Sequence, residues 1–317
     1  MITARPSCLT AAWPQHSASQ LHSFYQRDIA ALGPFAVPAH PGTPGAIRLV
    51  TWNVNYLSYA EASSPAAVWE ALRSMQGDVL VLQEFSAYPV GSGTGVGEVM
   101  DPEWAGGGVK PSALAQLLRE GGYSLHPTTN YYPTMLATRL ALCDPPPASM
   151  QLSSDRAAML ASVLLPGTQQ RLTVLGTHLD HLHAPQRLAE AQQLRAAMEG
   201  SSPVLLAADF NQPRSRDHSA EEWGWVAGKR KERGEAESDG VDELLQGMGL
   251  AACFDSTQPA QRNWPEGGLP PSTHWTGLCV DRAYARGMQC SRVWVCPSAL
   301  SDHAAVVTDW VCTEKSQ

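Results

Sequence analysis

Short apolar runs that end in polar residues recur along this chain. One of them, residues 204–208, is followed by the letters DFN, which place Asp209 and Asn211 two positions apart. Because side chains two residues apart on a strand project from the same face, this acid and this amide are expected to lie together at a strand end. A tight turn explains the same letters, since Asp and Asn are common turn residues and Pro213 follows closely. This run alone leaves a turn and a functional site both open.

The same pattern in other parts of the chain favours a functional site. Further apolar runs end in polar groups, and one more polar pair directly precedes a β-branched segment near the C-terminus. A rigid sheet can bring such strand ends together from distant parts of the chain, which is why sites assemble there. The residues concerned are Asn53 and Asn55, Gln83 and Glu84, His178, Asp180 and His181, and Asp302 and His303.

The spacing of apolar residues predicts strands that are separated in some places by helices and in others by turns. Such an order is typical of an α/β chain with a mixed sheet. Residues 130–142 and 156–165 look like a pair of adjacent strands. We also predict helices over residues 65–75, 112–120, 185–200 and 241–250, and strands over residues 48–54, 78–83, 171–176, 204–208, 277–286, 292–296 and 304–311.

One large domain is predicted over residues 46–312, after a partly ordered tail over residues 1–45. The chain has 317 residues, 44% of them hydrophobic, which suffices for a large core. A Gly-rich loop over residues 90–108 and an exposed, charged insertion at about 215–240 interrupt the strand pattern. Within the insertion, the basic residues 229–233 are interpreted as a solvated face, because an acidic stretch follows them. No run approaches the roughly 20 apolar residues of a membrane span, so a protein without one is expected.

Charge and cysteine usage narrow the class of protein. The net charge is −8, with 22 basic against 30 acidic residues, and this argues against a protein that coats nucleic acid non-specifically. Seven cysteines are scattered without a C-x-x-C pair, which argues against a disulfide framework and a structural zinc site. A reducing intracellular compartment, cytoplasm or nucleus, is the simplest inference, and organellar targeting stays open because the first 27 residues lack Asp and Glu.

Six short blocks, TWNVN, LQE, THLDH, AADFNQ, VDRAY and LSDHAAVV, occur in this order over roughly residues 46–311. Together they resemble the signature blocks of the endonuclease/exonuclease/phosphatase superfamily, with the tyrosyl-DNA phosphodiesterase-like branch among the nearer resemblances. The resemblance implies an α/β fold that is a four-layer α/β/β/α sandwich of two mixed β-sheets flanked by helices. It also implies a site where the ends of both sheets meet.

The resemblance assigns roles to individual residues. Asp209 would orient or deprotonate the attacking water, Asn211 and His178 would contact the phosphate, and His303, held by Asp281, would contact the scissile phosphate. Metal binding is implied for Asn53, Glu84 and Asp302, and substrate contacts are predicted for Asn55, Asp180 and Trp275. The chain departs from the family pattern at Asn55, where many nuclease branches have an aspartate, at Arg282, where an aromatic residue is common, and at Ala208, where glycine is usual.

These residue types fit phosphoester hydrolysis on chemical grounds. The reaction needs an in-line water, a base near it and positive charge on the non-bridging oxygens. Carboxylate ligands such as Glu84 and Asp302 suit a hard cation, Mg²⁺ or alternatively Mn²⁺, better than zinc. We therefore expect a Mg²⁺-dependent phosphodiesterase, nuclease or phosphatase that acts as a monomer on short or terminal phosphate esters, including nucleic-acid ends. A phosphoinositide or sphingolipid phosphoesterase and a catalytically inert binding protein on the same fold stay open as alternatives.

Overall fold

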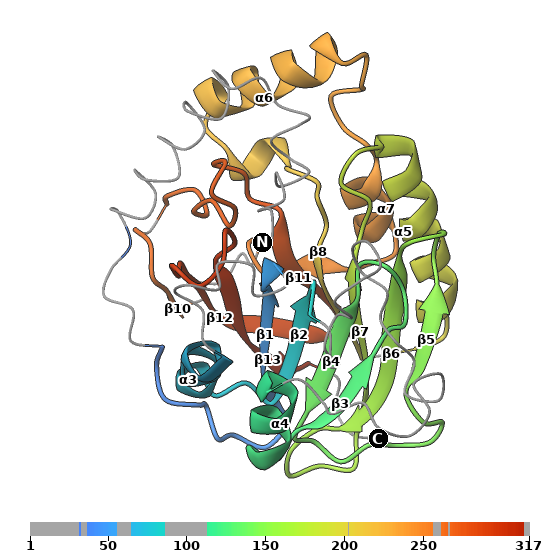
Figure 1. Ribbon diagram of the computed structural model, residues 1–317, viewed down its shortest axis with the longest axis vertical. Helices are drawn as coiled ribbons and strands as arrows, with labels where there is room; N and C mark the ends of the chain where they lie inside the picture. The colour runs from blue at the N-terminus through green and yellow to red at the C-terminus, as the bar shows by residue number, and fades with distance from the viewer. Residues whose placement is uncertain are drawn as a thin grey trace, which may run out of the picture.

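The computed structural model describes residue 32 and residues 37–55, 65–85, 113–201, 203–255, 261–265 and 267–313. Most of the predicted tail and the whole Gly-rich loop over residues 90–108 lie outside the described residues. The described residues form two β-sheets with helices on their outer faces (Figure 1). None of the described helices is both long and apolar enough to cross a membrane.

The first sheet has seven strands among the described residues, and its strand order brings the two ends of the domain together. Neighbouring strands are antiparallel except for the pairs β10 and β12, and β1 and β2, which are parallel, so the sheet is mixed. In spatial order the strands are β10 (Gln261–Arg262), β12 (Met288–Cys296), β13 (Ala305–Cys312), β1 (Ala46–Asn53), β2 (Val79–Gln83), β4 (Thr134–Thr138) and β3 (Ser124–Pro127).

The second sheet has six strands among the described residues and is also mixed. Its only parallel pair within the described part of the chain is β7 with β8. In spatial order the strands are β5 (Ala148–Gln151), β6 (Ala157–Leu164), β7 (Arg171–His178), β8 (Val204–Asp209), β11 (Asp281–Arg286) and β9 (Ala251–Ala252).

Helices cover the outer faces of both sheets. α3 (Pro65–Met75) turns Val68, Leu72 and Met75 inward at helical spacing, and with α4 (Ala113–Glu120) it packs on the first sheet. α5 (Ala184–Met198) and α7 (Val241–Gly247) pack on the second sheet, and they lie on the opposite side of the molecule from α3 in Figure 1. Between β8 and α7 the chain forms a short 3₁₀ helix, η2 (Ser215–Asp217), and α6 (Ala220–Glu232), which lies at the top of Figure 1.

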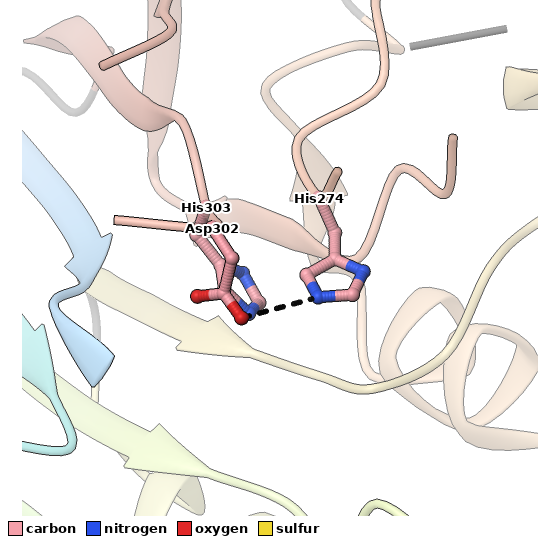
Figure 2. Close-up of side chains that lie close together, drawn as sticks. All are labelled: His274, Asp302 and His303. Atoms are coloured by element: carbon pink, nitrogen blue, oxygen red, sulfur yellow. Dashed lines mark ion pairs between the residues drawn. The ribbon is translucent and has the colours of Figure 1, made fainter. Parts of the chain in front are cut away.

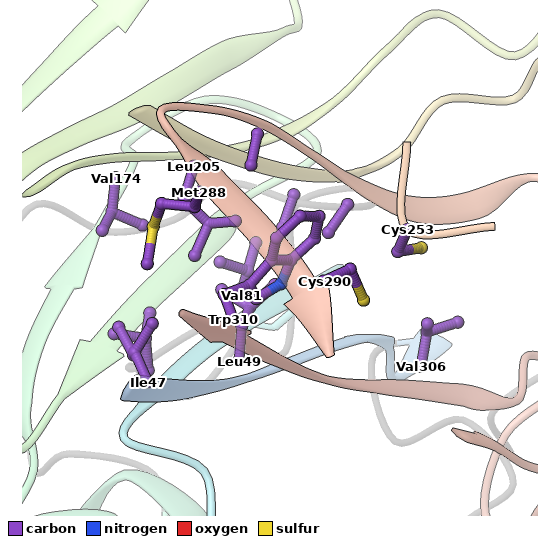
Figure 3. Packing of buried hydrophobic residues seen from close by; sticks show 14 of the residues in the cluster. Ile47, Leu49, Val81, Val174, Leu205, Cys253, Met288, Cys290, Val306 and Trp310 are labelled. Carbon is purple, nitrogen blue, oxygen red and sulfur yellow. The ribbon is translucent and has the colours of Figure 1, made fainter. Parts of the chain in front are cut away.

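The main core lies between the two sheets, and the period of two along each strand explains it. Leu49 of β1 and Leu205 of β8 belong to the cluster between the sheets, which Figure 3 shows. Their neighbours Val50 and Leu206 project the other way and pack under the helices. Strands that are buried on both faces therefore read as continuous apolar runs. The predicted four-layer sandwich of two mixed sheets is confirmed.

One predicted strand pairing is wrong. Residues 130–142 and 156–165 do not form a hairpin: β4 pairs with β2 in the first sheet, whereas β6 pairs with β5 and β7 in the second. Only after β4 does the chain reach the second sheet, where Leu142 bridges to Val163. Both segments are apolar on both faces, so their side-chain pattern carries no information about which sheet each one joins.

Candidate active site

Polar residues at the ends of five strands converge on one place. Across the second sheet, His178 of β7 pairs with Asp209 of β8, which in turn pairs with Asp281 of β11. In the first sheet, Asn53 ends β1, and Glu84 directly follows β2. The Nδ2 of Asn53 donates to Asp209 Oδ2 over 3.1 Å, so the strand ends of the two sheets are in direct contact.

The backbone turns sharply where these strands end. Asn55, Glu84 and Asn211 have φ angles of 44°, 53° and 50°, in the left-handed region that side chains with a Cβ rarely adopt. Each residue lies one or two positions beyond its strand. Non-glycine residues with positive φ cost conformational energy and concentrate at functional sites. The three turns therefore mark these strand ends as a candidate functional site.

Asp209 is a buried, ionised carboxylate. Its Oδ1 accepts the backbone N–H of Asn211 at 2.9 Å, and His178 Nε2 and His303 Nε2 lie 3.5 and 3.8 Å from its Oδ2. Burial opposes ionisation, but the imidazoles of His178 and His303 and the hydrogen bonds from Asn53 and Asn211 lower the pKa of Asp209 to about 2. Asp209 is therefore charged at neutral pH.

His303 carries the positive charge of the site. Its Nδ1 lies 2.8 Å from Asp281 Oδ2, and both side chains are buried. Burial lowers the pKa of His303, but Asp281 and Asp209 outweigh it and raise the pKa to about 10. Burial also raises the pKa of Asp281 to about 6, so both partners are charged at pH 7. The result is a buried ion pair that leaves Nε2 of His303 on the side of Asp209.

His178 is the neutral histidine of the site. Burial, and then the charge of Arg156, lower the pKa of His178 well below its ordinary value. Its Nε2 lies 2.9 Å from Nδ2 of Asn211, which also donates to the Leu179 carbonyl at 3.0 Å. At neutral pH His178 is therefore uncharged, whereas His303 keeps its proton.

Negative charge collects around Glu84. The pKa of Glu84 is raised to about 7. Burial is the largest cause, the carboxylates of Asp302 and Asp209 act in the same direction, and His303 opposes them. The Nδ2 of Asn53 approaches Glu84 Oε1 to 3.4 Å, whereas its Oδ1 accepts the N–H of Asn55 at 2.9 Å. A buried carboxylate with acidic neighbours and this oxygen-rich surrounding fits a hard divalent cation such as Mg²⁺ or Mn²⁺.

Two buried groups of histidine and acid side chains bring possible ligand atoms within 4.8 Å of one another. Figure 2 shows the group of His274, Asp302 and His303, and the other group consists of Asp209, Asp281 and His303. Both groups depend on His303, which is protonated and has no lone pair to offer a metal. We interpret them as ion-pair networks and assign the carboxylates around Glu84 as the better fit for a cation.

His274 is a site residue that the sequence analysis missed. Its backbone bridges to His303, its ring centroid lies 4.4 Å from that of His303, and its Nε2 lies 3.8 Å from Asp302 Oδ2 (Figure 2). Its Nδ1 lies 2.6 Å from the hydroxyl oxygen of Thr276, and burial lowers its pKa. From this part of the sequence only the neighbouring Trp275 is predicted to contact substrate, since no strand end marks His274.

The three residues predicted to contact substrate, Asn55, Asp180 and Trp275, differ in their surroundings. The carboxylate of Asp180 is engaged by the backbone N–H groups of Leu182 and His183 at the start of α5. Trp275 is half-buried, and its backbone N–H donates to the Asp302 carbonyl at 2.9 Å. A side-chain hydrogen bond from Asn55 helps to lower the pKa of Asp302 against the effect of burial. Asn55 thus joins the cluster, Asp180 does not, and the substrate roles of all three stay predictions.

A pocket adjoins the cluster and extends toward α6. Its lining includes Asn211, His274 and His303 of the cluster together with Val226 and Arg230 of α6. The expected solvated face over residues 229–233 is therefore corrected, because Arg230 is only 3% exposed. The charge pattern of the insertion hid this, since one helix turn has both a buried and an exposed face.

Arg282 stands at a position where the family pattern commonly has an aromatic residue, and it holds together two segments next to the site. It is fully buried and donates from Nη2 to the carbonyls of Cys279 and Gln212. Gln212 directly follows Asn211, so this guanidinium group ties the loop after β8 to the start of β11.

Residues 50–303 match the model of the Endonuclease/Exonuclease/phosphatase family. No curated protein sequence matches the chain significantly. Among solved structures, the catalytic domain of human Nocturnin with a bound sulfate anion has a TM-score of 0.57 and 17% identity, over 85% of this chain and 94% of that one. A humanized TDP2 from D. rerio has a TM-score of 0.54 and 14% identity, over 84% and 99%. ANGEL2, a 2′,3′-cyclic phosphatase in complex with adenosine-2′,3′-vanadate, has a TM-score of 0.58 and 11% identity, over 86% and 97%.

Proposed function

Because the chain belongs to the endonuclease/exonuclease/phosphatase family, we propose that it hydrolyses phosphoester bonds with the help of Mg²⁺, for which Mn²⁺ can substitute. The observation that carries the proposal is the arrangement around Asp209. Nε2 of a charged histidine and Nε2 of a neutral histidine each lie within 4 Å of the ionised Asp209 carboxylate, and the neutral His178 also lies within 4 Å of the Glu84 carboxylate. Phosphoryl transfer to water needs this combination of an oriented nucleophile and fixed positive charge.

His303 supplies the fixed positive charge. The Asp281 carboxylate holds its Nδ1 and keeps the imidazole protonated, so Nε2 can donate to a non-bridging phosphate oxygen. Negative charge on these oxygens develops as the P–O ester bond breaks, and a donor that is already in place stabilises the transition state more than the ground state. Asp281 acts through His303, as the orienting acid of a triad does.

Asp209 accepts a hydrogen bond from the attacking water. Its pKa of about 2 makes it a weak base, which favours orienting the water over full removal of its proton. Asn53 and the Asn211 backbone fix both carboxylate oxygens, so the direction of the remaining lone pairs is set by the two sheets. Neutral His178 and the Asn211 amide, which contact each other, add further polar groups next to Asp209.

A divalent cation would be held by the carboxylates of Glu84 and Asp302, with the amide groups of Asn53 and Asn55 beside them. When bound, Mg²⁺ supplies positive charge for the phosphate and for the leaving oxygen. The raised pKa of Glu84 supports this assignment, because uncompensated negative charge at a buried place is costly without a cation.

The pocket favours a soluble substrate over a lipid. An enzyme that acts on a lipid within a membrane needs an apolar rim that inserts at the membrane surface. Of the large apolar side chains that the structure describes as exposed, only Leu182 lines the pocket. The others are Tyr131, Leu142, Leu269 and Val311.

Short or terminal esters, including nucleic-acid ends, are the proposed substrates, and a monomer in an intracellular compartment is the proposed state. α6 lines one side of the pocket, and a chain with a net charge of −8 would not favour the many phosphate contacts that hold a long duplex. The described cysteines are free thiols, which supports a reducing compartment.

The test is hydrolysis of a phosphomonoester, a phosphodiester and a short end-labelled oligonucleotide in Mg²⁺, in Mn²⁺ and in EDTA. We expect activity only with a divalent cation, and loss of it in Glu84→Gln at ordinary Mg²⁺ with the fold intact. Glu199→Gln is the matched control, because Glu199 lies at the exposed end of α5 with a side chain that is 69% exposed. Full activity of Glu84→Gln in EDTA would overturn the metal assignment.

A supercoiled plasmid, offered beside the oligonucleotide at two salt concentrations, tests the preferred size of the substrate. We expect the oligonucleotide to be cut and the plasmid to stay closed. Efficient nicking of the plasmid that weakens strongly with salt would reverse this part of the proposal, because it would indicate many phosphate contacts along a duplex.

A further inference from the structure

The pocket that His274 and His303 line also has basic side chains in its lining. Three guanidinium groups line it: Arg187 of α5, Arg230 of α6, and Arg233 just after α6. Arg187 is already paired, since its Nε donates to Asp239 Oδ2 at 2.8 Å. The other two belong to the charged segment over residues 215–240.

Arg230 has bonding capacity to spare inside the protein. It is 3% exposed, and its Nε donates to the Ala236 carbonyl at 2.8 Å. Its Nη2 is buried without a hydrogen-bond partner among the described residues. Burial, and then the charges of Arg187 and Arg233, lower the pKa of Arg230 against the effect of Asp239. A buried, incompletely bonded guanidinium group is costly to a protein unless something binds to it.

Glu235 shows what kind of group binds there. Its carboxylate lies 3.8 Å from Arg230 Nε and 3.0 Å from Arg233 Nε, and it also lines the pocket. Two arginines therefore converge on one oxyanion at the pocket wall. Guanidinium groups bind carboxylate and phosphate with the same fork geometry, so a phosphate can replace this carboxylate.

Part of the pocket lining is apolar. Val226, Leu278 and Val280 form a small buried cluster and line the same pocket as His303 and Arg230. A ligand in this pocket therefore meets apolar surface as well as charged groups. Such a lining fits the carbon skeleton or ring of a small molecule better than a second row of phosphates.

We propose that Arg230 and Arg233 form a second anion subsite and that the substrate is a small phosphoester with a second phosphate, which this subsite binds while the first phosphate lies at His303. This inference deepens the proposed function and rests on it, because the ligand is a substrate only if the site hydrolyses phosphoesters. Glu235 occupies the subsite in the free protein, and the incoming phosphate displaces it from the two arginines.

The test uses ligands that cannot be hydrolysed. Straight-chain alkane bisphosphonates of increasing length and the alkylphosphonates of matching length are titrated into the full chain with Mg²⁺ by calorimetry. We expect at least one bisphosphonate to bind about tenfold or more tightly than its monophosphonate, as charge-assisted hydrogen bonds to two arginines imply. No advantage at any length would overturn the subsite.

Four variants locate the effect. Arg230→Gln and Arg233→Gln should each remove most of the bisphosphonate advantage and leave monophosphonate binding unchanged. Lys231→Gln is the matched control, because Lys231 is an exposed residue of the same helix turn and does not line the pocket. Glu235→Gln should increase the advantage, since it removes the competing carboxylate. Equal losses in Arg233→Gln and Lys231→Gln would mean a diffuse charge effect and would contradict the proposal.

The binding test and the hydrolysis test distinguish failure of the subsite from failure of the proposed function. Arg230 is buried, so thermal unfolding is measured for its variant, and the partly exposed Arg233 and Glu235 carry the test if that variant does not fold. If no phosphate ester is cleaved but the bisphosphonate advantage and its variants behave as expected, the proposed function fails and the subsite stands. If esters are cleaved but no bisphosphonate binds more tightly than its monophosphonate, the subsite fails and the proposed function stands.

Discussion

Asn53 donates a hydrogen bond to Asp209 from one sheet to the other, over 3.1 Å and 156 positions of sequence. This contact fixes the ends of β1 and β8 relative to each other at the place where the proposed water binds. A catalytic group that is oriented by a neighbouring amide depends on it for direction as well as for charge.

We therefore predict that Asn53→Ala lowers kcat about a hundredfold, because Asp209 loses its orientation. The free energy of unfolding should fall by about 1 to 3 kcal/mol, since a buried acceptor loses its donor. Urea unfolding and steady-state kinetics measure both. The control is Asn263→Ala, because Asn263 follows β10 and its amide donates to the carbonyl of Val295 in β12 and accepts from the N–H of Val295. A similar loss of activity in both variants would show that Asn53 contributes only stability.

Replacement of Asp281 by Asn should change the protonation of His303. With its pKa raised to about 10, the imidazole of His303 is charged below that pH and loses its proton as the pH rises through it. Without the Asp281 carboxylate, burial dominates and lowers the pKa toward or below its ordinary value. NMR of the imidazole in metal-free protein should show no titration between pH 5 and 9 in the wild type, and a neutral ring at pH 8 in Asp281→Asn. Identical spectra would contradict the assignment of the ion pair.

Glu84 should reduce stability in the absence of metal, and in a manner that depends on pH. Its pKa is raised from 4.5 to about 7, so the folded protein loses stability as the pH rises through this window and stays less stable above it. Glu84→Gln should therefore be more stable than the wild type at pH 8 in EDTA, by roughly 3 kcal/mol at most, and nearly equal at pH 4.5. Added Mg²⁺ should stabilise only the wild type. An equal gain at both pH values would show that the carboxylate is not the source.

His274 is expected to contribute to the reaction although no strand end marks it. Its Nε2 is buried without a hydrogen-bond partner among the described residues and lies beside His303. His274→Gln should lower kcat/KM by about tenfold or more, in line with the loss of one polar contact to the transition state, and should leave the melting temperature within a few degrees. His183→Gln, at a side chain that is 70% exposed, is the control. Unchanged kinetics in His274→Gln would leave the residue a structural role only.

The sequence predicts those parts of the fold that depend on local spacing. The helix over Pro65–Met75 follows from Val68, Leu72 and Met75, and the clustering of Asn53, Glu84 and Asp209 follows from polar residues at the ends of apolar runs. Side-chain direction along a strand is local, so these inferences need no knowledge of the partner strands.

Pairings between distant segments could not be predicted in the same way. His274 reaches His303 through a bridge between two irregular segments, and no periodicity reports such a contact. Asp180 follows a strand as Asp209 does, yet its carboxylate binds the backbone at the start of α5. Nothing in the sequence distinguishes an aspartate that binds the backbone of its own turn from a site residue, because both uses depend on the same acceptor oxygens.

The pairing of β1 with β13 has a consequence for the order in which the protein is made. During synthesis β1 leaves the ribosome early, with β2 as its first available partner, and its other edge stays unpaired until Ala305–Cys312 has been translated. Asp302 and His303 arrive just before that strand. A nascent chain that stops before Asp302 lacks an internal strand of the first sheet and the only cationic histidine among the described site residues, so neither the architecture nor the chemistry can be completed before nearly the whole domain has been synthesised.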